Sequence, residues 1–150
     1  MTLTIDAFTL GDVPAAVEIG VRYAPTTAIP GIPELDTDVY ATYLRGRLRR
    51  PSLNFAARKD GVLVAYFSTL QDSWVHSGDK ILCDTLLIVD PESGTGAAPM
   101  LISRMTNAAR EVGAKHILFT GISGIMTDDL RAVLVAKGYV DSGVSAVLEV

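Results

Sequence analysis

The sequence predicts an α/β (α+β) fold in which helices cover both faces of a mixed central sheet. Three observations support this fold class. The run Lys80–Val89 is almost continuously apolar, as expected of a central strand buried on both faces. Asp60-Gly61 separates two β-rich segments and is typical of a hairpin turn. Apolar residues recur at helical spacing in four further segments, of which 96–112 is the longest.

The N-terminal third contains one strand and two helices. Residues 3–7 alternate between apolar and polar side chains, which predicts a short strand. Apolar residues at helical spacing over 13–23 predict a first helix. Segment 24–34 contains three prolines and predicts a loop, and loops of this length often bind ligands. A second helix begins near Thr37, and Pro51 ends it.

The rest of the chain alternates strands and helices. In order, we expect hairpin strands at 53–58 and 62–70, a turn region at 71–79, a strand at Lys80–Val89, a helix at 96–112, a strand at 116–120, a helix at 127–137 and one or two strands at 139–150. The predicted order is therefore β-α-α-β-β-β-α-β-α-β, in a single domain that spans residues 1–150.

Composition and charge exclude several classes of protein. A net charge of −4 gives no general attraction to nucleic acid, so nucleic acid is not an expected partner. No stretch approaches the roughly 18 apolar residues of a membrane span. The N-terminus lacks the features of a secretory signal, so we expect a soluble, cytoplasmic protein without a membrane partner. The single cysteine, Cys83, is expected to be a small buried residue. His76 and His116 are far apart and lack a Cys/His cluster, so no metal site is expected.

The turn after the central strand is the most informative part of the sequence. The strand that ends at Val89 is followed by Gly94 and Gly96 and then by the start of a helix. Glycine lets a ligand approach the main chain closely. Free N–H groups at the start of a helix, together with the helix dipole, form a site for phosphate or pyrophosphate. The alternative is an ordinary strand-to-helix turn that uses two glycines.

The order of elements and the position of this turn resemble those of GNAT-type N-acetyltransferases, and the resemblance covers essentially the whole chain. In that family, a segment of the form Val-x-Pro followed by Arg/Gln-Gly-x-Gly-x-Gly/Ala binds the pyrophosphate of acetyl-CoA through backbone amides. The matching residues are Val89, Pro91, Ser93, Gly94, Thr95, Gly96, Ala97 and Ala98. Ser93 replaces the usual Arg or Gln, which loses a potential charge-assisted contact to phosphate but keeps the backbone amides.

The resemblance also implies roles for the strand before the turn and for the last helix. The backbone at Leu87, Ile88 and Val89 is expected to polarise the thioester carbonyl of acetyl-CoA, in the family's manner. In the last helix, Leu134 stands where the family often has a tyrosine that acts as a general acid. Thr127 falls near the position of the family's asparagine.

Two side chains are candidates for catalysis of acetyl transfer to an amine, which needs a group that accepts the amine proton. Asp84 interrupts the apolar strand, where burial raises the pKa of a carboxyl group, so it is the candidate base. The alternative for Asp84 is a structural acid bonded to backbone or to an arginine. Tyr66 could donate a proton or position the substrate, and a half-buried structural tyrosine is its alternative.

A dense basic cluster lies at the end of the second predicted helix. It consists of Arg45, Arg47, Arg49 and Arg50. Such a cluster could attract an acidic substrate, a nucleic acid or the ribose phosphate of CoA. The alternative is a solvated helix end whose cations complement the helix dipole.

We therefore expect an acetyl-CoA-dependent N-acetyltransferase that acts on an amine of a small molecule, a peptide or a protein by direct attack. The alternative is a GNAT-like protein with a binding or assembly role, because Ser93, Thr127 and Leu134 each depart from the family pattern. A nucleotide-binding domain fits less well, since the turn lacks both a third fingerprint glycine and a P-loop Gly-Lys-Ser/Thr. Acetyl-CoA and an amine acceptor are the expected partners, and the family's fold often forms homodimers.

Overall fold

The sheet has the predicted mixed architecture. The computed structural model describes residues 2–26, 34–119 and 128–140. Within these residues the strands are β1 (Leu3–Ala7), β2 (Ser52–Lys59), β3 (Val62–Ser73), β4 (Lys80–Val89) and β5 (His116–Ile117). They lie in the order β1-β2-β3-β4-β5. Neighbouring strands are antiparallel except for the parallel pair β4 and β5.

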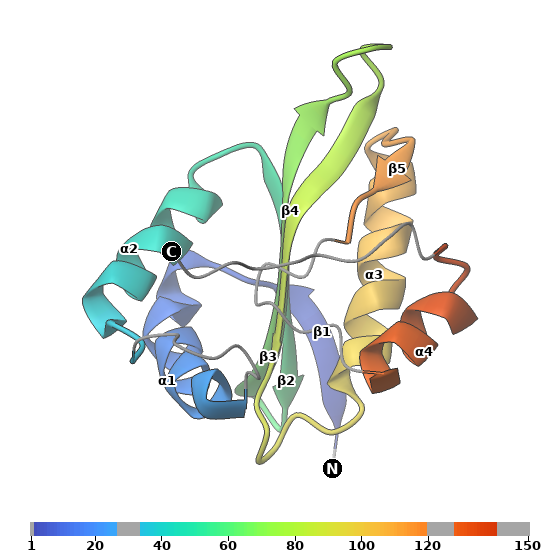
Figure 1. Ribbon diagram of the computed structural model, residues 1–150. Helices are drawn as coiled ribbons and strands as arrows, with labels where there is room; N and C mark the ends of the chain where they lie inside the picture. The colour runs from blue at the N-terminus through green and yellow to red at the C-terminus, as the bar shows by residue number, and fades with distance from the viewer. Residues whose placement is uncertain (1, 27–33, 120–127, 141–150) are drawn as a thin grey trace, which may run out of the picture.

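Helices cover both faces of this sheet, which confirms the predicted fold class (Figure 1). One face carries α1 (Val13–Tyr23) and α2 (Thr37–Leu48), and the other carries α3 (Ala97–Glu111) and α4 (Asp128–Ala136). Short 3-10 turns at Leu10–Asp12 and Ala24–Thr26 precede and follow α1. In the described part of the chain, no helix is long and apolar enough to cross a membrane.

The sheet separates two apolar cores because successive side chains of a strand point to opposite faces. Tyr66 and Phe67 are neighbours on β3 and both are fully buried, but they belong to different cores. The core under α1 and α2 contains Phe8, Val13, Ala16, Ile19, Leu44, Ala56, Leu63, Tyr66, Leu86 and Ile88. The core under α3 and α4 includes Phe55, Val64, Phe67, Leu82, Leu87, Leu101, Ile102, Met105 and Leu134.

Local signals in the sequence explain where several elements begin. Asp60 and Gly61 form the turn between β2 and β3 with φ angles of 50° and 84°. Positive φ at both central residues is the requirement of a favoured two-residue hairpin turn. Asp36 caps α2, because its side chain accepts hydrogen bonds from the amides of Asp38 and Val39.

Some elements differ in extent from the prediction. β3 continues beyond Leu70 to Ser73 because its pairing with β4 continues. The two strands form a hairpin that projects beyond the helices (Figure 1), with Trp74 41% exposed near its tip. β5 is shorter than the predicted 116–120, and α4 ends at Ala136, one residue before the predicted 137. The predicted loop residues 27–33, the end of the predicted strand at Thr120, Thr127 and the predicted strands after residue 140 lie outside the described residues.

The helices α1 and α2 approach each other closely at Gly20. A Cβ atom on Gly20 would lie 2.7 Å from Cε1 of Tyr40 and 3.3 Å from Cδ2 of Leu35. The Tyr40 ring cannot easily move aside, because its hydroxyl is hydrogen-bonded to that of Tyr66. The close packing of these helices therefore depends on a residue without a side chain.

Replacing Gly20 and Gly46 by alanine is expected to have opposite effects on stability. Gly20→Ala should lower the free energy of unfolding by about 1–3 kcal/mol, because the added carbon overpacks the contact with Tyr40. Gly46 lies in α2 with no atom within 4 Å of the added carbon. Gly46→Ala should therefore raise the free energy of unfolding by about 0.5–1 kcal/mol, the usual gain in a helix. Urea unfolding measures both, and a Gly20→Ala variant as stable as the wild type would contradict the close contact.

Candidate functional site

The strand β4 changes its pairing halfway along its length. Its partner on one side is β3, which pairs with it from end to end apart from one bulge. On the other side, β5 pairs with β4 at Ile81 and Leu82. No described residue pairs with this edge of β4 after Leu82. The C-terminal half of β4 therefore has one open edge in the described structure.

The open edge exposes the backbone of two predicted cofactor-binding residues. The amide of Asp90 donates to the carbonyl of Val64 on β3 at 2.8 Å. Antiparallel pairing alternates, so Ile88 also bonds toward β3, whereas the N–H and C=O groups of Leu87 and Val89 point to the open edge. The expectation that all three backbones face a ligand is thus wrong for Ile88, because that residue is paired within the sheet.

A bulge separates the paired and open halves of β4. At this point β3 advances by two residues and β4 by three, so Asp84 and Thr85 together stand opposite Thr69. Asp84 adopts a left-handed backbone conformation with φ of 49°. That conformation costs a residue with a side chain about 1–2 kcal/mol, so neighbouring contacts must stabilise it.

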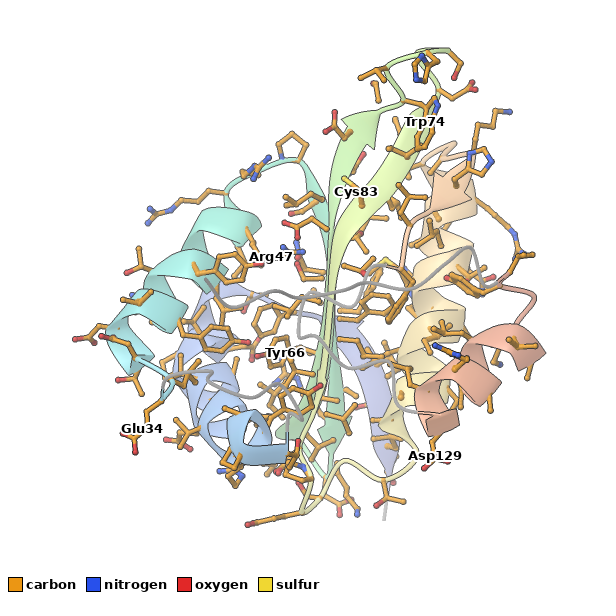
Figure 2. All side chains as sticks on the ribbon, viewed as in Figure 1. Glu34, Arg47, Tyr66, Trp74, Cys83 and Asp129 are labelled. Atoms are coloured by element: carbon orange, nitrogen blue, oxygen red, sulfur yellow. The ribbon has the colours of Figure 1, made fainter. Side chains whose placement is uncertain are left out.

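Asp84 is paired with an arginine rather than isolated in an apolar strand. Nη1 of Arg47 lies 2.8 Å from Oδ2 of Asp84, and the Arg47 side chain is 3% exposed. The structure therefore shows the structural alternative for Asp84, an acid bonded to an arginine. Arg47 lies on the side of the sheet covered by α1 and α2, as does Tyr66 (Figure 2). The alternative of a solvated helix end is wrong for Arg47, which is buried, whereas Arg45, Arg49 and Arg50 are exposed.

Tyr66 is completely buried beneath α1 and α2. Its ring stacks on that of Phe8 with 4.9 Å between centroids, and its hydroxyl is hydrogen-bonded to the hydroxyl of Tyr40. Burial raises the pKa of Tyr66 well above its usual value and that of Tyr40 to about 12. Both hydroxyls are therefore neutral at physiological pH, and Tyr66 is a more deeply packed residue than the half-buried one considered from the sequence.

Asp90 organises the turn between β4 and α3. Its carboxylate accepts hydrogen bonds from Nε and Nη2 of Arg22 at 3.1 and 3.0 Å and from Oγ of Ser93 at 2.6 Å. The pKa of Asp90 is lowered from 3.8 to about 2, chiefly by the hydrogen bonds from Arg22 and further by those from Ser93 and the Glu92 amide, against the opposing effect of burial. Ser93 thus serves the turn itself, and no pattern in the sequence singles out Asp90.

The two glycines of the turn have different reasons to be glycine. A Cβ atom on Gly94 would lie 2.4 Å from Cγ1 of Val89 and 2.9 Å from the carbonyl oxygen of Val64, so the turn packs directly on the sheet. Gly96 caps α3 with φ of 84° and has no atom within 4 Å of the position of a Cβ. Gly94 is therefore required by close packing, and Gly96 by a left-handed conformation beside open space.

Several backbone amides of the turn are available to a ligand. The amide of Gly94 donates to the carbonyl of Asp90 at 2.8 Å, and the amide of Ala97 donates to that of Gly94 at 3.0 Å. The amides of Thr95, Gly96 and Ala98 donate to no other described residue. The predicted pyrophosphate cradle is thus reduced to three open amides, because the turn uses those of Gly94 and Ala97 itself.

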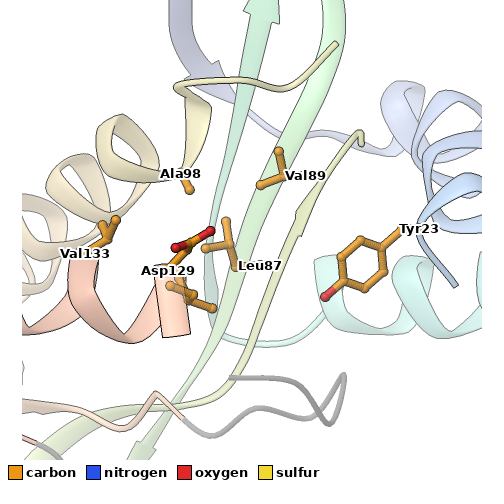
Figure 3. Close-up of a pocket in the computed structure, with 7 residues that line it drawn as sticks. Tyr23, Leu87, Val89, Ala98, Asp129 and Val133 are labelled. Carbon is orange, nitrogen blue, oxygen red and sulfur yellow. The ribbon is translucent and has the colours of Figure 1, made fainter. Parts of the chain in front are cut away.

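A pocket of about 260 Å³ lies along the open edge of β4 (Figure 3). Its lining residues are Tyr23, Leu87, Val89, Ala98, Asp129, Leu130 and Val133. Tyr23 faces the strand from the end of α1, and Asp129 faces it from the start of α4 (Figure 3). The structure therefore brings three predicted cofactor-binding residues into one pocket, and neither Asp84 nor Tyr66 lines it.

The sequence interpretation missed Tyr23 and Asp129 as pocket residues. Each lies at the end of a predicted helix, which was the available signal. A position at a helix end does not show that the two helix ends meet at one strand.

Leu134 is buried in the core under α3 and α4 rather than in the pocket. Cys83 lies outside the pocket, and burial raises the pKa of its thiol, which disfavours the nucleophilic thiolate.

The Asp90 interaction predicts a stability difference that depends on pH. The pKa of Asp90 is about 2 in the folded protein, compared with 3.8 for an ordinary aspartate. The ionised carboxylate therefore stabilises the fold above about pH 4, and this contribution is lost as the pH falls toward about 2. Wild type should unfold at higher urea concentration than Asp90→Asn at pH 6, and the difference should shrink between about pH 4 and 2. Arg22→Gln should remove most of this pH dependence, and a difference that does not vary with pH would contradict the assignment.

The sequence matches no protein-family model and no curated protein sequence. Solved structures, in contrast, match nearly the whole chain. A possible acetyltransferase from Clostridium difficile 630 has a TM-score of 0.73 and 14% identity, covering 99% of this chain and 97% of that chain. A predicted acetyltransferase from Clostridium acetobutylicum, solved with acetyl-CoA, has a TM-score of 0.71 and 16% identity, covering 99% and 96%.

A third structure is that of an enzyme whose name states its substrate. The ribosomal-protein-alanine N-acetyltransferase from Brucella melitensis biovar Abortus 2308 has a TM-score of 0.71 and 18% identity, covering 99% of both chains. Similarity at these identities establishes the arrangement of strands and helices. The fold of this chain is therefore that of the GNAT-type N-acetyltransferases.

Proposed function

We propose that this protein is an acetyl-CoA-dependent N-acetyltransferase that acts on an amine of a small molecule, a peptide or a protein. The observation that carries the proposal is a path between two sets of open backbone groups. One set lies at the edge of β4, at Leu87 and Val89, and the other at Thr95, Gly96 and Ala98, where the turn leads into α3. An elongated ligand with a phosphate group and a carbonyl group can bind along such a path. The similar structure from Clostridium acetobutylicum contains acetyl-CoA, which supports the choice of ligand.

The turn suits the pyrophosphate of this co-substrate. The amides of Thr95, Gly96 and Ala98 lie at the N-terminus of α3, where the helix dipole favours an anion. The open space beside Gly96 leaves room for the phosphates. Asp90 would repel an anion, but Arg22 balances its charge through a two-bond ion pair. Ser93 lacks the long hydrogen-bond donor of the family's usual Arg or Gln, so backbone amides supply most of the binding.

The open edge suits the thioester. The N–H groups of Leu87 and Val89 would polarise its carbonyl while the amine nitrogen attacks the carbonyl carbon. The carbon–sulfur bond then breaks, CoA leaves as the thiolate, and the nitrogen loses a proton. Asp84 stays a prediction as the proton acceptor: it does not line the pocket, and its carboxylate is paired with Arg47. Tyr66, which was the second catalytic candidate, is assigned a packing role because it is buried.

Binding of acetyl-CoA should raise the melting temperature, and Gly96→Glu should abolish this shift. A ligand at about 100 times its Kd stabilises the native state by about 2.7 kcal/mol. The glutamate side chain would fill the space beside Gly96 and place a carboxylate against the phosphates. Thermal shift and calorimetry with acetyl-CoA at up to millimolar concentration provide the measurement.

Gly113→Glu is the matched control for this experiment. Gly113 follows the other end of α3, has φ of 74° and also has no atom within 4 Å of an added Cβ. Both variants therefore carry the same side chain in a similarly strained conformation, but only Gly96→Glu should lose acetyl-CoA binding. A folded wild type that acetyl-CoA does not stabilise would reject the transferase proposal and favour the binding or assembly role.

A further inference from the structure

The bulge in β4 determines which backbone groups face the pocket. Before the bulge, the carbonyls of Lys80 and Leu82 point toward β5 and accept hydrogen bonds at 2.8 and 2.7 Å. After the bulge, Leu87 and Val89 point to the same edge. Even-numbered residues thus face this edge on one side of the bulge and odd-numbered residues on the other. The extra residue at the bulge reverses this alternation, because a shift of one residue exchanges the residues whose backbone groups face one edge of the strand with those that face the other.

Arg47 holds this bulge through an extensive set of hydrogen bonds. Its Nη2 atom donates to the carbonyl of Ser68 on β3 at 3.1 Å and to the carbonyl of Asp84 on β4. Its Nη1 atom donates to Oδ2 of Asp84 and to the hydroxyl of Tyr43, both at 2.8 Å. Its Nε atom donates to Oγ of Ser68 at 3.0 Å. One planar guanidinium therefore joins both strands and α2 at the point where the strand register changes.

We propose that Arg47 is a positioning residue for the acyl thioester. By fixing the bulge, it keeps the N–H groups of Leu87 and Val89 directed at the thioester carbonyl. The inference rests on the proposed function. Arg47 acts through β4, because its side chain lies on the sheet face covered by α1 and α2 and does not line the pocket (Figure 2). The pyrophosphate would be bound beyond Val89 at the turn. Loss of Arg47 should therefore weaken the hydrogen bonds to the thioester carbonyl and change the Kd for acetyl-CoA only slightly.

The thioester carbonyl itself provides the test. Isotope-edited infrared spectroscopy of acetyl-CoA labelled with carbon-13 at the carbonyl reports how strongly that group is hydrogen-bonded. Bound to the wild type, the carbonyl band should lie below its position in free acetyl-CoA. Arg47→Lys keeps the charge but cannot reproduce the planar set of bonds, so the band should move back toward the free position. The Kd for acetyl-CoA should change less than about threefold. Any amine that supports turnover should show kcat reduced by about tenfold or more.

Arg45→Lys is the control, because Arg45 lies on the same helix two residues away and is exposed. It should leave the band, the Kd and kcat unchanged. An unmoved band in folded Arg47→Lys overturns the proposal. Should Arg47→Lys not fold, Arg47→Gln takes its place, because a shorter, uncharged side chain cannot reproduce the contacts with Ser68 and Asp84 on both strands, and an unmoved band in that folded variant also overturns the proposal. A wild type that does not bind acetyl-CoA would instead reject the proposed function.

Discussion

The alternation of backbone direction along a β-strand is the constraint on which this site depends. β4 must pair with β3 along nearly its whole length, with β5 at one end, and present an open edge at the other. Without the bulge, the backbone groups of Leu86 and Ile88 would face the open edge in place of those of Leu87 and Val89. The added residue at Asp84 exchanges the two sets. The cost is a left-handed aspartate and a buried cation. Buried ion pairs contribute little net stability, so the value of this one lies in the geometry that it fixes.

The turn after β4 illustrates how an anion site can contain an acid. Asp90 shapes the turn through its carboxylate and its carbonyl, and it orders Ser93 and the amides of Glu92 and Gly94. Such a group would oppose a phosphate if its charge were unbalanced. Arg22 reaches it from the last turn of α1, so the helix layer on one face of the sheet supports a turn that leads into the helix on the other. The site therefore depends on both layers.

The sequence predicted those features that arise from local pattern. Alternation identified β1, the Asp60-Gly61 turn identified the hairpin, and the glycines after Val89 identified the turn that borders the pocket. It could not predict contacts between distant residues. The partner of Asp84 lies 37 positions away on α2, and nothing in the apolar run around Asp84 names it. Tyr23 and Asp129 likewise reach one pocket only because separate helices end beside the same strand. Pairing direction at Ile88 depends on a bulge, which periodicity does not show.

The projecting β3–β4 hairpin has a practical consequence for spectroscopy. Trp74 is the single tryptophan of the chain, and it lies near the tip of that hairpin, at the opposite end of the molecule from Asp129 (Figure 2). Intrinsic fluorescence is thus a local reporter of the hairpin. It records whether the two strands stay paired at their far end, and it is nearly silent about events at the glycine turn. Fraying of the tip would change the emission while both apolar cores are intact, so circular dichroism is the appropriate measure of global unfolding.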